Sequence, residues 1–354
     1  MPVGNKKNLY LDRPSKSRGH MSGEDVTWTG QPTSEHIYKY LKDMGLVEEP
    51  SENLIREMVR KTLRELPGQQ RIDECIVVGG QASGENVLVK SRDRNYDANV
   101  KIVRDLTDDG IEIVYMIDLD SGYIEGMNSE GIGIINATLD VQDGKEAEVA
   151  QPSKSGPRIR QCLSNKNLAS TIDDILNYEG GVEGHTIVSS PKSMYAIEHP
   201  GGGSVDTMEK NTVTELPMDG TFDVFTNHGE NIPAAGYDLE GHPKGYHSSL
   251  ARQKQAQQAL VDEENFERIP VLMTRQNFEP ASRFNMRRDI PKGMRTVSQV
   301  AMHLPDLEFV FYYFPHVCTL KTIEDRTPEG YEPRIGIRIV RYKNYKKSGK
   351  SVKK

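Results

Sequence analysis

The sequence is poor in cysteine and contains no long apolar run. Its three cysteines, Cys75, Cys162 and Cys318, show no C-x-x-C spacing. Neither a disulfide framework nor a structural zinc site is therefore expected. No segment approaches the roughly 18 apolar residues that cross a bilayer, and the N-terminus lacks the apolar centre of a signal peptide. We expect a cytoplasmic protein without a membrane span, in a reducing compartment where one thiol can stay reactive.

Several familiar catalytic motifs are also missing. Gly79 and Gly84 have the spacing of a phosphate-binding loop, but Glu85-Asn86 follows where Lys and then Ser or Thr are needed. The nine histidines include no H-E-x-x-H pair, and GGGSVD lacks the second glycine of a G-x-S-x-G turn. We expect neither a cofactor nor a bound metal.

Charge of one sign does not dominate the chain. Lys plus Arg number 45 against 52 Asp plus Glu, a net charge of −7, which disfavours nucleic acid as a partner. The exception is RYKNYKKSGKSVKK at 341–354, with six Lys and one Arg. We interpret it as a solvated basic tail, with an anionic partner as the alternative.

The first 74 residues differ from the rest in composition and in hydrophobic pattern. Residues 1–32 are rich in Gly, Pro, Ser and charge, which predicts an irregular lead-in. Within 33–67, Ser34 and Ser51 can cap two helices, and Pro67-Gly68 ends the second. Residues 1–74 are therefore predicted to form a small helical leader.

Residues 75–340 are predicted to form one α+β body. Short Ile- and Val-rich runs such as CIVV, IEIVYMIDL and GIGIINATL indicate strands. Helical patterns occupy 156–164 and 167–179, and a polar helix follows from residue 248. Strands then close the chain with EFVFYYF and IGIRIVRY. This order favours mainly antiparallel sheets.

Four segments combine into a more specific pattern: Cys75 at the start of a predicted strand, RNYD at 94–97, GMNSEGIGIINATL at 126–139, and TNH at 226–228 followed by SSLAR at 248–252. In this order they resemble the cysteine branch of the N-terminal-nucleophile hydrolases, which includes choloylglycine hydrolase, penicillin V acylase, acid ceramidase and isopenicillin N acyltransferase. The resemblance covers the chain from residue 75 onward. It implies a four-layer αββα sandwich of antiparallel sheets.

The resemblance also implies how Cys75 works. In that family the nucleophile becomes the first residue by cleavage of the preceding bond, here Glu74–Cys75, and its own α-amine is the general base. An α-amine has a pKa of about 7.7–8 against about 10.4 for Lys, so part of it is neutral at physiological pH. A thiol beside it can be deprotonated in place. An ordinary buried strand cysteine is the alternative that position alone leaves open.

Further roles are carried over from the family motifs. Asp97 would contact the amine and thiol of the nucleophile, and Arg94 would orient substrate and catalytic groups. A surface Arg–Asp pair is the alternative for this motif. Asn227 would donate to the tetrahedral oxyanion, and Arg252 would hold the nucleophile region.

Two further positions remain open. Asn136 would also help to hold the oxyanion, although an offset of one or two residues would select Thr138 instead. His228 either touches substrate or is a polar loop histidine.

The expected activity is hydrolysis of a linear amide C–N bond, or transfer of its acyl group to another amine, through a thioester on Cys75. The substrate would be a small N-acyl amide or a short peptide. The apolar faces of the leader helices favour either a retained small subunit or another partner. The rival hypothesis is a catalytically silent structural or interaction protein of the same fold.

Overall fold

The computed structural model describes residues 73–139, 155–177, 182–199, 211–232, 236–279, 281–290 and 293–342. The two helices expected in 33–67, the irregular lead-in at 1–32 and residues 343–354 of the basic tail lie outside the described residues. Within the described part, no helix has the length and hydrophobicity needed to cross a bilayer.

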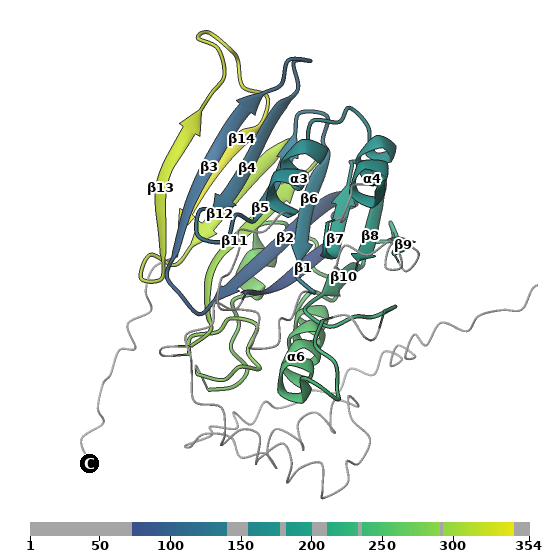
Figure 1. Cartoon of the computed structure of the whole chain (residues 1–354), viewed down its shortest axis with the longest axis vertical. Coiled ribbons are helices and arrows are strands. Elements are labelled where there is room, and N and C mark those ends of the chain that lie inside the picture. The colour runs from purple at the N-terminus through teal and green to yellow at the C-terminus, as the bar shows by residue number, and fades with distance from the viewer. Residues whose placement is uncertain are drawn as a thin grey trace, which may run out of the picture.

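Two β-sheets form the body (Figure 1). The six-stranded sheet has the order β10 (Phe222–Phe225), β1 (Asp73–Ala82), β2 (Glu85–Arg94), β11 (Arg295–His303), β12 (Glu308–Tyr313) and β14 (Gly336–Arg341). The eight-stranded sheet has the order β13 (Cys318–Asp325), β3 (Ala98–Leu106), β4 (Glu112–Asp118), β5 (Ile124–Asn128), β6 (Gly133–Ala137), β7 (Gly184–Ser189), β8 (Met194–His199) and β9 (Thr212–Glu215). Neighbouring strands are antiparallel except at β12–β14 and β13–β3, which are parallel.

Helices cover the outer face of each sheet. One apolar core lies between the sheets and contains Val77 of β1 and Ile187 of β7. A second joins the six-stranded sheet to α6 (Pro243–Ala259) and α7 (Arg268–Leu272). A third joins the eight-stranded sheet to α3 (Ser155–Cys162) and α4 (Leu168–Asn177), which lie across that sheet in Figure 1. The predicted α+β class and four-layer αββα arrangement are confirmed.

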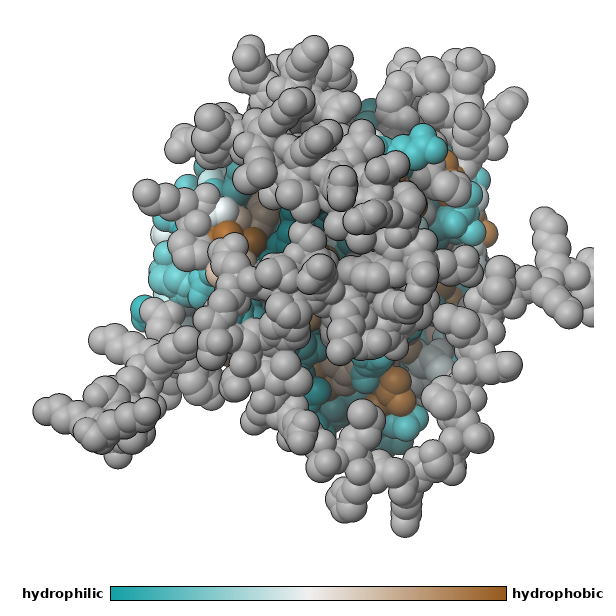
Figure 2. Space-filling model, turned by 90° about the horizontal axis from the view of Figure 1, so that it is seen from below, coloured by the Kyte–Doolittle hydropathy of each residue, from teal (hydrophilic) through white to brown (hydrophobic). Residues whose placement is uncertain are grey.

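Figure 2 shows one face of the molecule, on which the coloured residues are mainly hydrophilic with small hydrophobic groups between them. The exposed large hydrophobic side chains among the described residues come from separate elements and loops: Leu119, Val213, Met218, Leu239, Val261, Val271 and Ile323. Single exposed apolar residues of this kind are ordinary on soluble domains.

The β1–β2 hairpin fixes the orientation of Cys75. Ser83 and Gly84 form its two-residue turn with φ of 50° and 82°, the positive values that a type I′ turn requires. The register that follows pairs Cys75 with Arg92 and Glu74 with Asp93. Because side chains alternate along a strand, Cys75 faces the core between the sheets, whereas Glu74 faces the layer of α6.

The elements differ from expectation in several places, of which three bear on the site or the sheet order. Helix α6 begins at Pro243, five residues before the predicted start, because proline suits the first turn of a helix. Strand β13 was not predicted; its residues are mostly exposed or half-buried, so it lacks an apolar alternation. Strand β1 begins at Asp73, which places the expected junction Glu74–Cys75 inside a strand rather than between elements.

Close packing between strands gives a test of the fold. A Cβ on Gly126 of β5 would lie 2.5 Å from the Val114 carbonyl oxygen and 2.6 Å from Tyr115 Cβ. We therefore expect Gly126→Ala to lower the free energy of unfolding by about 1–3 kcal/mol, measured by urea unfolding. Gly336→Ala is the control, because its Cβ would meet no atom closer than 3.9 Å. Equal stabilities of the two variants would contradict this register.

Candidate active site

The backbone of Cys75 is held by two of the residues that the sequence nominates. The Cys75 N–H donates to Asn227 Oδ1 at 3.1 Å, and the Cys75 carbonyl accepts from Arg252 Nη1 at 3.2 Å. Asn227 lies two residues beyond β10 and is fixed by its own N–H, which donates to Ser249 Oγ at 2.8 Å. Arg252 comes from the middle of α6. The fold thus brings Cys75, Asn227 and Arg252 together.

The orientation of the Asn227 amide is determined by its partners. Its Oδ1 receives hydrogen bonds from the Cys75 N–H and from Arg252 Nη2 at 2.9 Å, and both are donors only. Its Nδ2 donates to the Thr138 carbonyl at 2.9 Å. In the intact chain Asn227 therefore holds the nitrogen of Cys75, while the donor expected to serve the oxyanion is engaged with Thr138.

Next to this site lies a group of four buried charges, the Glu74 cluster: Glu74, Asp93, Arg252 and Arg288. Glu74 Oε2 lies 2.8 Å from Arg252 Nη2 and 2.7 Å from Arg288 Nη2. Asp93 Oδ2 lies 3.3 Å from Arg252 Nη1 and 3.6 Å from Arg288 Nε. The two carboxylates are cross-strand neighbours, and each guanidinium group pairs with both of them.

Charge pairing decides which ionic form Glu74 takes. Burial would raise the pKa of Glu74, but Arg288 and Arg252 outweigh it and lower that pKa to about 2. For Asp93, burial dominates over the same two arginines and raises its pKa. The pKa of Arg288 is raised despite burial, because Glu74 and Asp93 lie against it. Glu74 is therefore the firmly ionised acid of the cluster.

A second buried group, the inter-sheet cluster, comprises Lys90, Arg92, Arg94, Asp118 and Glu125. Arg92 Nη1 lies 3.1 Å from Asp118, and Lys90 and Arg92 both pair with Glu125. Arg94 Nε lies 3.2 Å from Asp118. Burial would raise the pKa of Asp118, but Arg94 and Arg92 lower it to about 2. In the strand register Arg92, rather than Arg94, stands opposite Cys75 on the same face.

Asp97 and Asn136 were expected beside Cys75, but they contact other residues. The Asp97 side chain is 69% exposed and pairs with Arg295 Nη1 at 2.9 Å. Buried Asp93 is the acid that Arg252 links to the Cys75 carbonyl. Asn136 Nδ2 donates to the Glu183 carbonyl at 2.8 Å and to Thr186 Oγ1 at 2.9 Å. The structure thus places these two residues outside the group around Cys75.

His228 is a buried part of the scaffold in the intact chain. Its Nδ1 lies 2.9 Å from Ser249 Oγ and 3.1 Å from Thr226 Oγ1. Burial, and then the charges of His185 and Arg252, lower the pKa of His228 to about 3. A neutral imidazole in this position links the loop after β10 to α6.

The other two thiols have environments unsuited to nucleophilic attack. Burial raises the pKa of Cys162 to about 12 and the pKa of Cys318 to about 12. A thiol with so high a pKa is almost entirely protonated at neutral pH. Neither Cys162 nor Cys318 is therefore suited to act as a nucleophile.

Four residues that sequence reasoning missed shape this site: Glu74, Arg92, Asp93 and Arg288. The first three follow from one signal, the Ser83-Gly84 turn. Its two-residue length sets the register of the hairpin and places Arg92 across from Cys75. Arg288 lies in a loop between α7 and β11, and no local pattern marks it.

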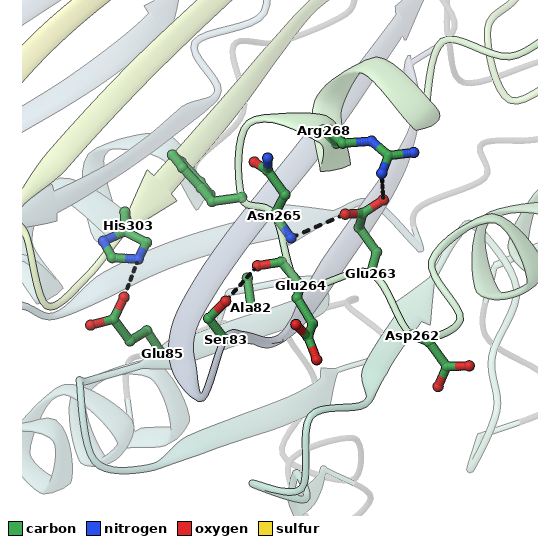
Figure 3. Close-up of a pocket in the computed structure, with 10 residues that line it drawn as sticks. Ala82, Ser83, Glu85, Asp262, Glu263, Glu264, Asn265, Arg268 and His303 are labelled. Atoms are coloured by element: carbon green, nitrogen blue, oxygen red, sulfur yellow. Dashed lines mark hydrogen bonds and ion pairs between the residues drawn. The ribbon is translucent and has the colours of Figure 1, made fainter.

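A surface hollow of about 630 Å³ lies at the other end of β1 (Figure 3). Ser83, Glu85, Asn265 and His303 are among its lining residues. Ala82 lies seven positions along the extended strand from Cys75, or roughly 23 Å away. Within the described part of the chain, the carboxylates of Glu85 and Asp306 flank His303 at metal-ligand spacing. This hollow is separate from the Cys75 site.

The chain is similar to known proteins in structure but not detectably in sequence. No family model and no curated protein sequence matches the chain. Two variants of conjugated bile acid hydrolase from Clostridium perfringens match with 13% identity over 68% of this chain and 89% of theirs, at TM-scores of 0.41 and 0.39. Penicillin V acylase from Agrobacterium tumefaciens matches with 11% identity over 68% of this chain and 86% of its own, at 0.37.

The Glu74 cluster makes the stability of the intact chain depend on pH. The folded-state pKa of about 2 lies below the ordinary 4.5. Ionised Glu74 therefore stabilises the fold above pH 4.5, and this contribution is lost as the pH falls toward 2. The comparison uses a Cys75→Ala background, in which the chain is expected to stay intact. There Glu74→Gln should reduce the free energy of unfolding at pH 7 by on the order of 3 kcal/mol. It should also flatten the dependence of that free energy on pH between pH 4.5 and pH 2.

Urea unfolding at several pH values measures this effect. The charge of Glu74 helps to raise the pKa of Asp93, so the difference between the two proteins reports on Glu74 together with its effect on Asp93. Parallel pH profiles for the two proteins would show that Glu74 is not ion-paired as described.

Proposed function

We propose that the chain hydrolyses a linear amide C–N bond, or transfers its acyl group to an amine, through a thioester on Cys75 after cleavage of Glu74–Cys75. The observation that carries this proposal is the hydrogen bond from the Cys75 nitrogen to Asn227 Oδ1. That nitrogen is an amide in the intact chain and an α-amine after cleavage. Asn227 can orient it in both states.

Cleavage follows from the chemistry of a thiol next to a peptide bond. The Cys75 sulfur attacks the Glu74 carbonyl carbon, the C–N bond breaks, and the nitrogen takes up the thiol proton. Water then attacks the thioester and releases Glu74 as a carboxylic acid with Cys75 as the new N-terminus. Arg252 holds the Cys75 carbonyl and so restrains the residue during this step.

The freed α-amine then serves as general base. It takes the thiol proton as the sulfur attacks the substrate carbonyl, and it passes that proton to the leaving amine. With Glu74 gone, Arg252 and Arg288 face Asp93 alone, which leaves one excess positive charge beside the amine. Nearby positive charge disfavours the ammonium form, so a neutral base is favoured at neutral pH.

Arg92 supplies a fixed cation on the face of β1 and β2 that carries the Cys75 side chain. Charge develops on sulfur and on the substrate oxygen during attack, and a preorganised cation stabilises such charge. Water or a second amine then completes hydrolysis or transfer. The proposed substrate class is a small N-acyl amide or short peptide, and the proposed location is the cytoplasm. The leader would stay bound through its helices as a small subunit, while Glu74 at its new end leaves the site.

One observation favours the rival function, a catalytically silent scaffold. Glu74 makes two buried ion pairs on the acyl side of the bond to be cut. Removal of one partner from a buried ion pair lowers the stability of a fold by about 3–5 kcal/mol. These contacts stabilise an uncut chain, which would then act through its leader and basic tail.

Intact mass spectrometry of the purified protein separates the two functions. Cleavage at Glu74–Cys75 divides the 39.8-kDa chain of 354 residues into fragments of about 8 and 31 kDa, in proportion to 74 and 280 residues. Cys75→Ala should leave the chain whole, because it removes the attacking sulfur. Cys162→Ala is the control and should be cut like the parent. A full-length chain that hydrolyses amides would refute the proposal.

A second prediction concerns Asn227. Its replacement by Ala removes the acceptor that holds the Cys75 nitrogen, so the amine and thiol lose their alignment. We expect kcat for amide hydrolysis to fall by about 100-fold, with a slower first cleavage. Asn265→Ala, in the hollow at the far end of β1, should leave kcat unchanged. Normal turnover by Asn227→Ala would remove this residue from the site.

A further inference from the structure

In the intact chain Glu74 fills a closed anion-binding pocket. Its Oε1 accepts from the Tyr237 hydroxyl at 3.0 Å, and its Oε2 accepts from Arg252 and Arg288. The Glu74 side chain is 2% exposed. The groups that contact its carboxylate are hydrogen-bond donors, and two of them are cations. The pocket is therefore built for a carboxylate rather than for a neutral or apolar group.

The pocket also holds donor capacity that Glu74 leaves unused. Among the described residues, Arg288 Nη1 and Arg252 Nε are buried without a hydrogen-bond partner. If Glu74 leaves, Asp93 is the remaining acid of the cluster against two guanidinium groups. A buried cation without a counter-charge is costly. Binding of another anion in the vacated pocket would therefore be strongly stabilising.

Glu74 is itself the acyl group of the bond that Cys75 cuts. Transfer of an acyl carbon from the nitrogen to the sulfur of one cysteine passes through a five-membered ring, so the acyl chain stays in place. Three carbons separate the Glu74 carbonyl carbon from its side-chain carboxyl. An acyl group on the sulfur with the same spacing therefore reaches the same pocket.

We propose that this pocket, once vacated, binds a carboxylate on the acyl part of the substrate. The substrate class is an amide of a five-carbon diacid, such as a glutaryl or glutamyl amide. This inference rests on the proposed function of Cys75 as an N-terminal nucleophile. The sulfur forms a bond to the acyl carbon, the amine leaves with the thiol proton, and water releases the diacid and restores the thiol.

Two chromogenic amides test the substrate class on the cleaved protein. N-Glutaryl-p-nitroanilide carries the carboxylate, and N-pentanoyl-p-nitroanilide has the same chain length without it. We expect kcat/KM to be at least about 100-fold higher for the glutaryl amide, because the pentanoyl group leaves buried charged donors unpaired. Equal or faster hydrolysis of the pentanoyl amide overturns the inference.

Tyr237→Phe removes one donor from the pocket and keeps the ring. It should raise KM for the glutaryl amide about tenfold and leave KM for the pentanoyl amide unchanged. Tyr331→Phe is the matched control, because its hydroxyl bonds Glu112 instead. An equal effect of Tyr237→Phe on both amides contradicts a carboxylate site.

A measurement without turnover keeps the two proposals distinguishable. In intact Glu74→Ala/Cys75→Ala protein, acetate replaces the missing carboxylate and should raise Tm, whereas acetamide should not. No difference between acetate and acetamide overturns the pocket. Cleavage at Cys75 with preference for the pentanoyl amide overturns this inference alone. A chain that is never cut overturns the proposed function and this inference with it. If the double variant does not fold, the comparison of the glutaryl and pentanoyl amides tests the inference instead.

Discussion

The position of Cys75 depends on the pairing of four charges that are buried beside it. Glu74 and Asp93 stand opposite each other on neighbouring strands, and Arg252 of α6 and Arg288 each pair with both of them. Without the two arginines, the like charges would repel across the strand pair. Arg252 also contacts Asn227 and the Cys75 carbonyl, so this one residue takes part both in the charge pairing and in the hydrogen bonds around Cys75.

The same cluster links the intact chain to the chemistry proposed for it. While Glu74 is in place, the cluster is balanced, with two acids against two arginines. Removal of Glu74 leaves an excess positive charge at the point where a free α-amine and an acyl substrate would meet. One set of contacts can thus stabilise the intact chain, lower the basicity of the amine and select an anionic acyl group. Each effect follows from Coulomb interactions in a buried site.

Sequence patterns predicted the α+β class because apolar periodicity and turn residues are local signals. The layered sandwich, and the grouping of Cys75 with Asn227 and Arg252, were implied by the family resemblance. Neither the patterns nor the resemblance located the buried acid: the motif selected Asp97, whereas strand alternation and the hairpin register bury Asp93. Arg288 and the parallel edge strand β13 depend on contacts between distant segments, which no local pattern records.

In the proposed mechanism the thiol and the α-amine of Cys75 act together. Cyanobenzothiazole reagents condense with a free 1,2-aminothiol and not with an internal cysteine, so they report directly on a freed Cys75. We expect peptide mapping of active protein to find the condensed ring on Cys75, and formation of this ring to abolish amide turnover. Active protein in which Cys75 stays within an uncut peptide, without this adduct, would contradict this mechanism.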